Sequence, residues 1–235
     1  MSWKVFLFNY IMKHLTILLS LFLILSCNSK NGNMIIKGKI NNFQKGKVYL
    51  ERIQDTILVK VDSVTLDGSN SFELTDNVTS PQIYYLSISD SDKYLKFFGE
   101  QGEIVIISDL KTFGYRPIIK GSKNQLFLDE YTKMNTKFNN LFLDLIKEKF
   151  EAHSDTAKVR EIEKKIANTE RRKYLYTINF AANHADYEIA PFLILTETPK
   201  VNPKLLDTIE KSLTENVKNS LYGKQFMKLM KNPKN

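Results

Sequence analysis

Short runs of alternating apolar and polar residues fill the first half of this chain. Residues 34–40 and 57–61 alternate in this way, and eight of the nine glycines lie before residue 122. The pair Asp67–Gly68 predicts a tight turn because glycine supplies the positive φ that such turns need, and we expect the strand after it to return. Several short strands at this spacing predict an antiparallel β-sandwich or open barrel over residues 34–121.

The hydrophobic period changes after residue 121. Apolar residues then recur at spacings of three and four, which indicates one face of an amphipathic helix: Phe127, Tyr131, Met134, Phe138, Leu141 and Leu145. Ser122 and Asp155 are the expected N-caps of two helices, and Asn202–Pro203 is expected to open another. A last helix would carry Val217, Leu221, Phe226 and Leu229. We therefore predict a helical domain over residues 122–231 and an α+β chain.

The N-terminus has the pattern of an export signal. Residues 15–26 form an uncharged apolar run that follows Lys13 and His14. This run is shorter than the roughly 20 residues of a membrane span and matches the apolar core of a signal peptide. Residues 1–26 are the predicted signal peptide, and we expect Met12 to be the true start.

Cys27 ends this run in a lipidation pattern. Residues 23–27 read Leu-Ile-Leu-Ser-Cys and resemble a bacterial lipobox, although Leu25 stands where a small residue is commoner. We predict that Cys27 is lipidated, with residues 27–33 as a polar tether; a buried free cysteine and an uncleaved anchor are the alternatives. The expected location is the envelope of a Gram-negative bacterium, facing the periplasm, with the outer membrane favoured over the inner.

Composition narrows the possible chemistry. The 235 residues hold one cysteine, which excludes an internal disulfide, a four-cysteine zinc site and a CxxC redox pair. The formal net charge is +8, yet an exported protein is not expected to meet nucleic acid. The basic run 171–173 is interpreted as a solvated helix face, with anionic lipid headgroups as the alternative.

Few residues suggest a site. His153 and His184 are expected in a helix–helix loop and at a helix end, and we predict no catalytic, cofactor or metal site. Five aromatic residues of the β region are either core residues or the lining of a groove for a peptide or glycan: Tyr84, Tyr85, Tyr94, Phe97 and Phe98. Both interpretations stay open at this point.

The final helix is crowded with apolar residues. Phe226, Met227, Leu229 and Met230 cannot all share one stripe of 3.6 periodicity. Either they pack on the other helices, or this end docks a second protein or a second copy of the chain. Phe226 and Leu229 are the candidate docking residues.

The order of several motifs resembles a known arrangement. The motifs are 38–40 (Gly-Lys-Ile), 46–50 (Gly-Lys-Val-Tyr-Leu), 61–64 (Val-Asp-Ser-Val), 67–68 (Asp-Gly) and 72–74 (Phe-Glu-Leu). The chain resembles the domain of unknown function, with its helical connector, that precedes the thioredoxin-like domain of bacterial lipoprotein thiol–disulfide oxidoreductases.

The redox chemistry of that family lies in a downstream Trp-Cys-x-x-Cys motif, which these 235 residues do not contain. The resemblance therefore implies a non-enzymatic relative: a lipid-anchored binding or interaction module of unknown ligand. It could partner another envelope protein, such as a separate thioredoxin-like protein. The alternatives are an accessory or truncated N-terminal part of such an oxidoreductase, and a hydrolase with an undetected site.

Overall fold

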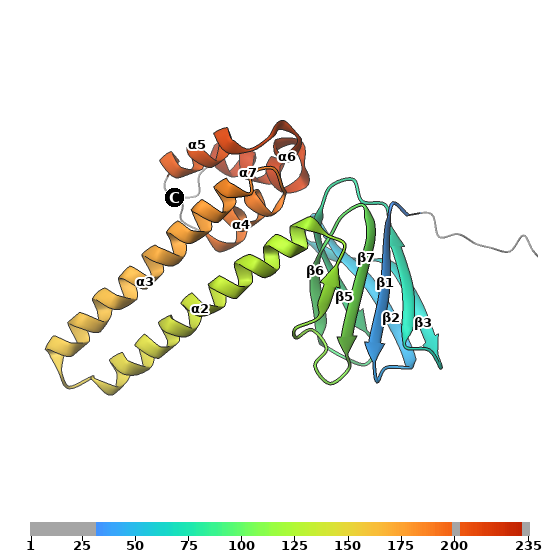
Figure 1. Cartoon of the computed structure of the whole chain (residues 1–235), viewed down its shortest axis with the longest axis horizontal. Coiled ribbons are helices and arrows are strands. Elements are labelled where there is room, and N and C mark those ends of the chain that lie inside the picture. The colour runs from blue at the N-terminus through green and yellow to red at the C-terminus, as the bar shows by residue number, and fades with distance from the viewer. Residues whose placement is uncertain (1–31, 199–202, 232–235) are drawn as a thin grey trace, which may run out of the picture. The chain divides into compact units, whose positions relative to one another are not determined.

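A computed structural model describes residues 32–198 and 203–231. The predicted signal peptide, Cys27 and residues 27–31 of the tether lie outside this part, and so does Asn202. Eight strands come first and helices follow (Figure 1), in two sheets that do not close into a barrel. The predicted α+β class is confirmed. No helix among the described residues is long and apolar enough to cross a membrane.

Eight strands form the two sheets. The first sheet has the order β4-β1-β7-β8, with β1 (Met34–Asn41), β4 (Ser71–Asp76), β7 (Gly102–Asp109) and β8 (Ile118–Lys120). The second has the order β3-β2-β5-β6, with β2 (Lys45–Gln54), β3 (Ile57–Asp67), β5 (Gln82–Ile88) and β6 (Tyr94–Gly99). In the first sheet every second side chain points at the second sheet, and the two inward sets make one core.

Two details of the strand pairing differ from the prediction. The strand after Asp67–Gly68 does not return along β3; it crosses to the other sheet, where β4 pairs antiparallel with β1. Phe72 and Leu74 thereby cover the opposite side of the core. In addition, β1 and β7 pair in parallel, so the sandwich is not wholly antiparallel. Both pairings join strands that are far apart in the sequence, and a local pattern cannot report them.

The described tether residues belong partly to the fold. Asn33, which was assigned to the tether, donates from Nδ2 to the Val78 carbonyl at 2.9 Å. Its Oδ1 accepts from the Val78 amide at 2.7 Å. This two-way bond ties the start of β1 to the loop after β4, so the folded region includes Asn33.

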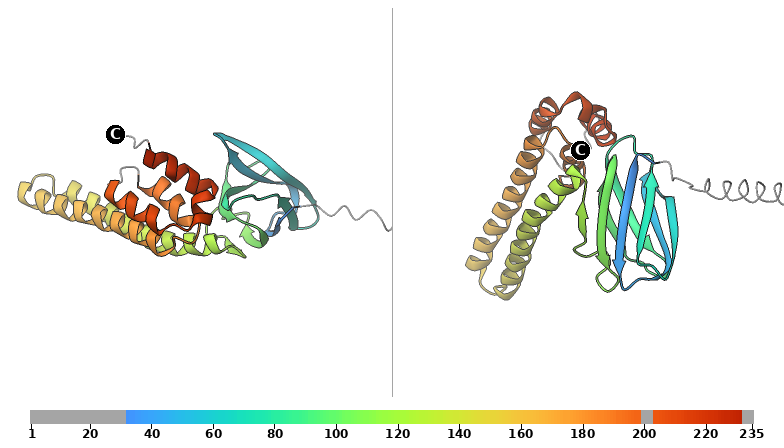
Figure 2. Two further views of the ribbon diagram at one scale, coloured as in Figure 1. Left: turned by 90° about the horizontal axis from the view of Figure 1, so that it is seen from above. Right: turned by 45° about the vertical axis from the view of Figure 1, so that its right-hand side comes forward.

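Within the described residues the helices are α2 (Lys123–Glu151), α3 (Thr156–Asn183), α4 (Ile189–Glu197), α5 (Pro203–Ser212), α6 (Glu215–Asn219) and α7 (Leu221–Lys231). Both predicted N-caps are confirmed: the side chain of Ser122 accepts from the Gln125 amide, and that of Asp155 accepts from two amides of α3. Long helices α2 and α3 run antiparallel as a hairpin (Figure 2). On the predicted stripe of α2, Tyr131 and Leu145 are buried, whereas Leu141 is exposed.

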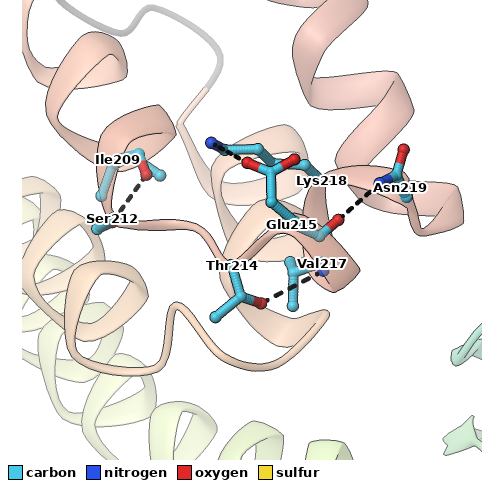
Figure 3. Close-up of polar contacts among 7 residues, drawn as sticks. All are labelled: Ile209, Ser212, Thr214, Glu215, Val217, Lys218 and Asn219. Atoms are coloured by element: carbon cyan, nitrogen blue, oxygen red, sulfur yellow. Dashed lines mark hydrogen bonds and ion pairs between the residues drawn. The ribbon is translucent and has the colours of Figure 1, made fainter.

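The single last helix that was predicted is instead two helices, and α4 is additional. Thr214 caps α6 by accepting from the Val217 amide, and Lys218 and Asn219 both bind Glu215 within it (Figure 3). The chain then breaks at Ser220, whose extended backbone ends α6. Glycine is required three residues later, because a Cβ at Gly223 would lie 1.9 Å from the Val217 carbonyl oxygen.

Candidate binding surface

The histidines singled out in the sequence lie in separate turns. His153 is exposed after α2, and its Nδ1 lies 3.2 Å from the Phe150 carbonyl oxygen. His184 is the C-cap of α3, and its ring packs against the rings of Phe127 and Phe180 at centroid distances of 4.3 and 4.1 Å. Among the described residues no group of three or more His, Cys, Asp or Glu could hold a metal ion.

The five aromatic residues of the β region separate onto two faces of the β3-β2-β5-β6 sheet. Tyr84 and Phe97 point into the sandwich, are fully buried, and stack with ring centroids 5.9 Å apart. Phe98 points outward but is fully buried beneath the helices. Only Tyr85 and Tyr94 reach the open part of the outer face. The five residues therefore do not line one groove, and three of them are core residues.

Strand register builds two polar and aromatic rows across this outer face. The first row, in the order β3, β2, β5 and β6, is Ser63, Tyr49, Ser87 and Tyr94. The second row is Lys60, Glu51, Tyr85 and Lys96. A bulge between the two rows adds one residue to β3, which keeps both Ser63 and Lys60 on the outer side. We call these eight residues the tyrosine face.

Specific contacts hold the tyrosine face. Ser87 Oγ donates to Glu51 Oε2 at 2.8 Å, and Glu51 is only 8% exposed. Lys60 Nζ lies 4.0 Å from the centroid of the Tyr49 ring, a cation–π contact. Tyr85 and Tyr94 meet edge to face at 5.4 Å, and burial raises the pKa of Tyr85. The three tyrosine rings of the face therefore surround the largely buried side chain of Glu51.

A groove of about 510 Å³ continues the tyrosine face toward the helices. Tyr85 and Lys96 belong to both, and Phe192 of α4 and Tyr222 of α7 form the opposite wall. Tyr222 Oη accepts from the Ile83 amide at 3.0 Å, and burial raises the pKa of Tyr222 to about 12. A volume in this range is typical of ligand sites that combine apolar walls with a few polar groups.

The start of α2 fixes the helices against the sheet. Gln125 Oε1 accepts from the Phe98 amide at 2.7 Å, which caps the edge strand β6. Asn124 Nδ2 donates to Glu100 at 2.8 Å and to Glu188 at 3.0 Å, while its Oδ1 accepts from the Ile189 amide at 2.8 Å. This buried bridge joins the β6–β7 turn to α2 and to the start of α4, the helix that carries Phe192 of the groove wall.

The candidate docking residues lie on α7. Phe226 is fully buried within the helical core, so in this structure it is a packing residue. Leu229 is half-buried, and Met227 and Met230 pack against the same core. Docking through the side chain of Phe226 would require α7 to move.

In the basic run, Arg171 and Arg172 are exposed on α3, and Lys173 Nζ donates to Asn139 Oδ1 at 2.9 Å.

The fold and this surface define an α+β protein whose two-sheet sandwich has an outer face partly covered by helices. Residues 34–127 match the family described as "Domain of unknown function (DUF4369)". Domains of this family commonly lie N-terminal to thioredoxin-like domains, so the resemblance seen in the β region is confirmed. The match contains the whole tyrosine face. No curated protein and no solved structure matches the chain.

Sequence reasoning missed most of the tyrosine face. Tyr49, Glu51 and Ser87 were not singled out, although the alternation within β2 places Tyr49 and Glu51 on the same side of the strand. The sequence could not show which residues of other strands lie beside them, because the residues of one row are up to 45 positions apart in the chain.

Proposed function

We propose that this chain is an exported lipoprotein, anchored through lipid on Cys27 and facing the periplasm, that acts as a non-catalytic binding module. The tyrosine face is the observation that carries the binding role. Tyrosine offers a large rigid contact area at low entropic cost, and serine offers adaptable hydrogen bonds, which is the composition of many binding surfaces. A solvated sheet face that served only solubility would not need three tyrosines around a buried carboxylate.

Geometry also favours binding over catalysis at this face. Ser87 donates to Glu51, so its hydroxyl is held by an acceptor that orients it. Both described histidines make their contacts within the helical region, and neither pairs with Ser87. A serine nucleophile would need an adjacent base within hydrogen-bond reach. The rows instead present fixed rings and hydrogen-bonding groups on a paired sheet, which suits recognition of a ligand.

The anchor is tested by labelling cells with a fatty-acid analogue. Wild-type protein should take up the label, and Cys27→Ser should lose it, because the thiol is the acylation site. Equal label on both proteins would contradict the anchor. A gene that starts at Met12 should export the protein normally, and density separation of the two membranes tests the expected outer-membrane location.

Binding is tested on the mature chain, residues 27–235, carrying Cys27→Ser and labelled with ¹⁵N. Titration with a solubilised envelope extract from the source cells should shift amide resonances of β2, β5 and β6 in a saturable way. Shifts confined to other elements, or no shift, would contradict a binding module that uses the tyrosine face.

A second candidate is an accessory or N-terminal part of a thiol–disulfide oxidoreductase. The matched family favours it, since its members commonly precede thioredoxin-like domains. An in-frame Trp-Cys-x-x-Cys motif in the DNA after codon 235, or saturable binding of a separate thioredoxin-like envelope protein, would support this candidate. As a module without a CxxC pair, the purified mature chain should not reduce insulin disulfides above buffer.

A further inference from the structure

We propose that the ligand of the tyrosine face is a saccharide, an inference that rests on the proposed binding function. The sugar would lie across the two rows, with its C–H face on the exposed ring of Tyr94 and its hydroxyl groups toward Ser87 and the Glu51 carboxylate. The rings, the carboxylate and the charges of the face each point to this chemistry.

The rings suit a ligand that is apolar on one side and polar at its rim. Tyr94 is 58% exposed, and its edge-to-face contact with Tyr85 keeps the pair in a fixed geometry. An aromatic ring has a negative face that attracts weakly positive hydrogen atoms. The C–H groups of a pyranose are such hydrogens, and its hydroxyls project outward from the same ring toward polar neighbours.

Glu51 supplies acceptors at the centre of the face. An ionised carboxylate has about four lone-pair sites and accepts only. Among the described residues, Ser87 is the side chain that donates to it, at Oε2. Sugar hydroxyl groups are donors, so they can fill the acceptor sites of Glu51 that Ser87 leaves open. Hydrogen bonds to a charged acceptor are stronger than those between neutral groups. A purely apolar ligand would supply no donor to the acceptor sites of this carboxylate that Ser87 does not fill.

The charges and the backbone disfavour other polymers. Lys60 and Lys96 stand at the two ends of the second row, beside Glu51 and Tyr85 respectively, and Lys60 lies over the Tyr49 ring, so the eight residues carry a formal net charge of only +1. Extended peptides often bind by adding a strand to an open sheet edge. Here the rows lie on the flat of the sheet, and the Phe98 amide on the neighbouring edge is occupied by Gln125.

Chemical treatment of the envelope extract separates the possible ligands. One portion is oxidised with periodate, which cleaves the vicinal diols of sugars, and is then quenched; another is digested with protease, which is then inactivated. We expect periodate to abolish the amide shifts of β2, β5 and β6 and protease to leave them. The opposite result would overturn the saccharide while the binding module stands. No shift with untreated extract would overturn both.

Defined probes and variants then test the site. The mature Cys27→Ser chain is titrated with the neutral tetrasaccharides of maltose, cellulose and β-1,4-mannan type, all of which have the vicinal diols that periodate cleaves, and at least one should give saturable shifts. Tyr94→Ala and Glu51→Gln should each weaken that binding about tenfold or more, as loss of a central anchor does. The matched control Phe150→Ala removes an 80% exposed ring from the tip of the α2–α3 hairpin and should bind like wild type.

Tyr94 is exposed, so its variant should stay folded even if Glu51→Gln does not. Unchanged binding by a folded Tyr94→Ala protein, or saturation by none of the three tetrasaccharides, would overturn the saccharide assignment.

Discussion

The two faces of the β3-β2-β5-β6 sheet carry similar residue types and have different surroundings. Tyr84 and Tyr85 are consecutive, yet Tyr84 is fully buried in the sandwich and Tyr85 lies at the edge of an open groove. Phe97 and Phe98 divide in the same way between the sandwich core and the helical cover. An aromatic-rich strand pair therefore supplies a core with one set of rings and a surface with the other.

Substitutions on the inner face of this sheet should lower the free energy of unfolding far more than substitutions on its open outer face. Phe97→Ala removes a fully buried ring from β6 and should lower the free energy of unfolding by about 3–5 kcal/mol. Tyr94→Ala on the same strand removes an exposed ring and should cost about 1 kcal/mol or less. Urea unfolding of both variants measures the difference. Equal losses would show that the open rows are part of the core.

The Asn124 bridge between the sheet and the helices should make the next largest contribution to stability. Asn124→Ala removes the amide that joins Glu100, Glu188 and the Ile189 amide, and leaves buried polar groups unpaired. We expect a loss of about 2–4 kcal/mol. Asn139→Ala, in the same helix, loses one exposed bond to Lys173 and should cost under about 0.5 kcal/mol. If the two variants unfold at the same urea concentration, the Asn124 bridge does not hold the helices against the sheet.

The adjacent tyrosines allow a comparison of single hydroxyl groups. Tyr84 Oη donates to Asp76 Oδ2 at 2.6 Å, beside Arg52 Nε at 3.3 Å from the same oxygen. Tyr84→Phe should therefore cost about 1–3 kcal/mol, since the hydroxyl binds a charged partner. Tyr85→Phe loses no hydrogen bond of this kind and should be close to neutral. A larger loss for Tyr85→Phe in the same unfolding assay would reverse the assignment of the two faces.

The smallest expected effect is confined to alkaline pH. Burial raises the pKa of Tyr222 from 10.0 to about 12, so folding favours its neutral form. That contribution is complete below the unfolded pKa of about 10 and is lost as the pH rises toward 12. The fall in unfolding free energy between about pH 9 and about pH 11.5 should be smaller in Tyr222→Phe than in wild type. If the unfolding free energy falls equally with pH in both proteins, the Tyr222 side chain is not buried between the helices and the sheet.

Local sequence signals predicted much of the fold because they act over short distances. Alternation placed Met34, Ile36 and Ile40 on one side of a strand, and all three are fully buried. Ser122 and Asp155 capped the helices where they were expected to, because a cap needs only the next two or three amides. The split of the last helix at Ser220 was missed, since it depends on the close approach of Gly223 to α6.

The sequence by itself determined most of the strands, the two long helices, the α+β class and the family resemblance of the β region. Only the tertiary structure decided which strands are neighbours: β4 with β1, β1 with β7 in parallel, and β5 between β2 and β6. Period-two alternation says that a strand has two faces, but not which strand lies beside it or what covers each face. Tyr49, Ser87 and Tyr94 form one row because β2 pairs with β5 and β5 pairs with β6, and the row stays open because α4 and α7 cover the neighbouring part of the face.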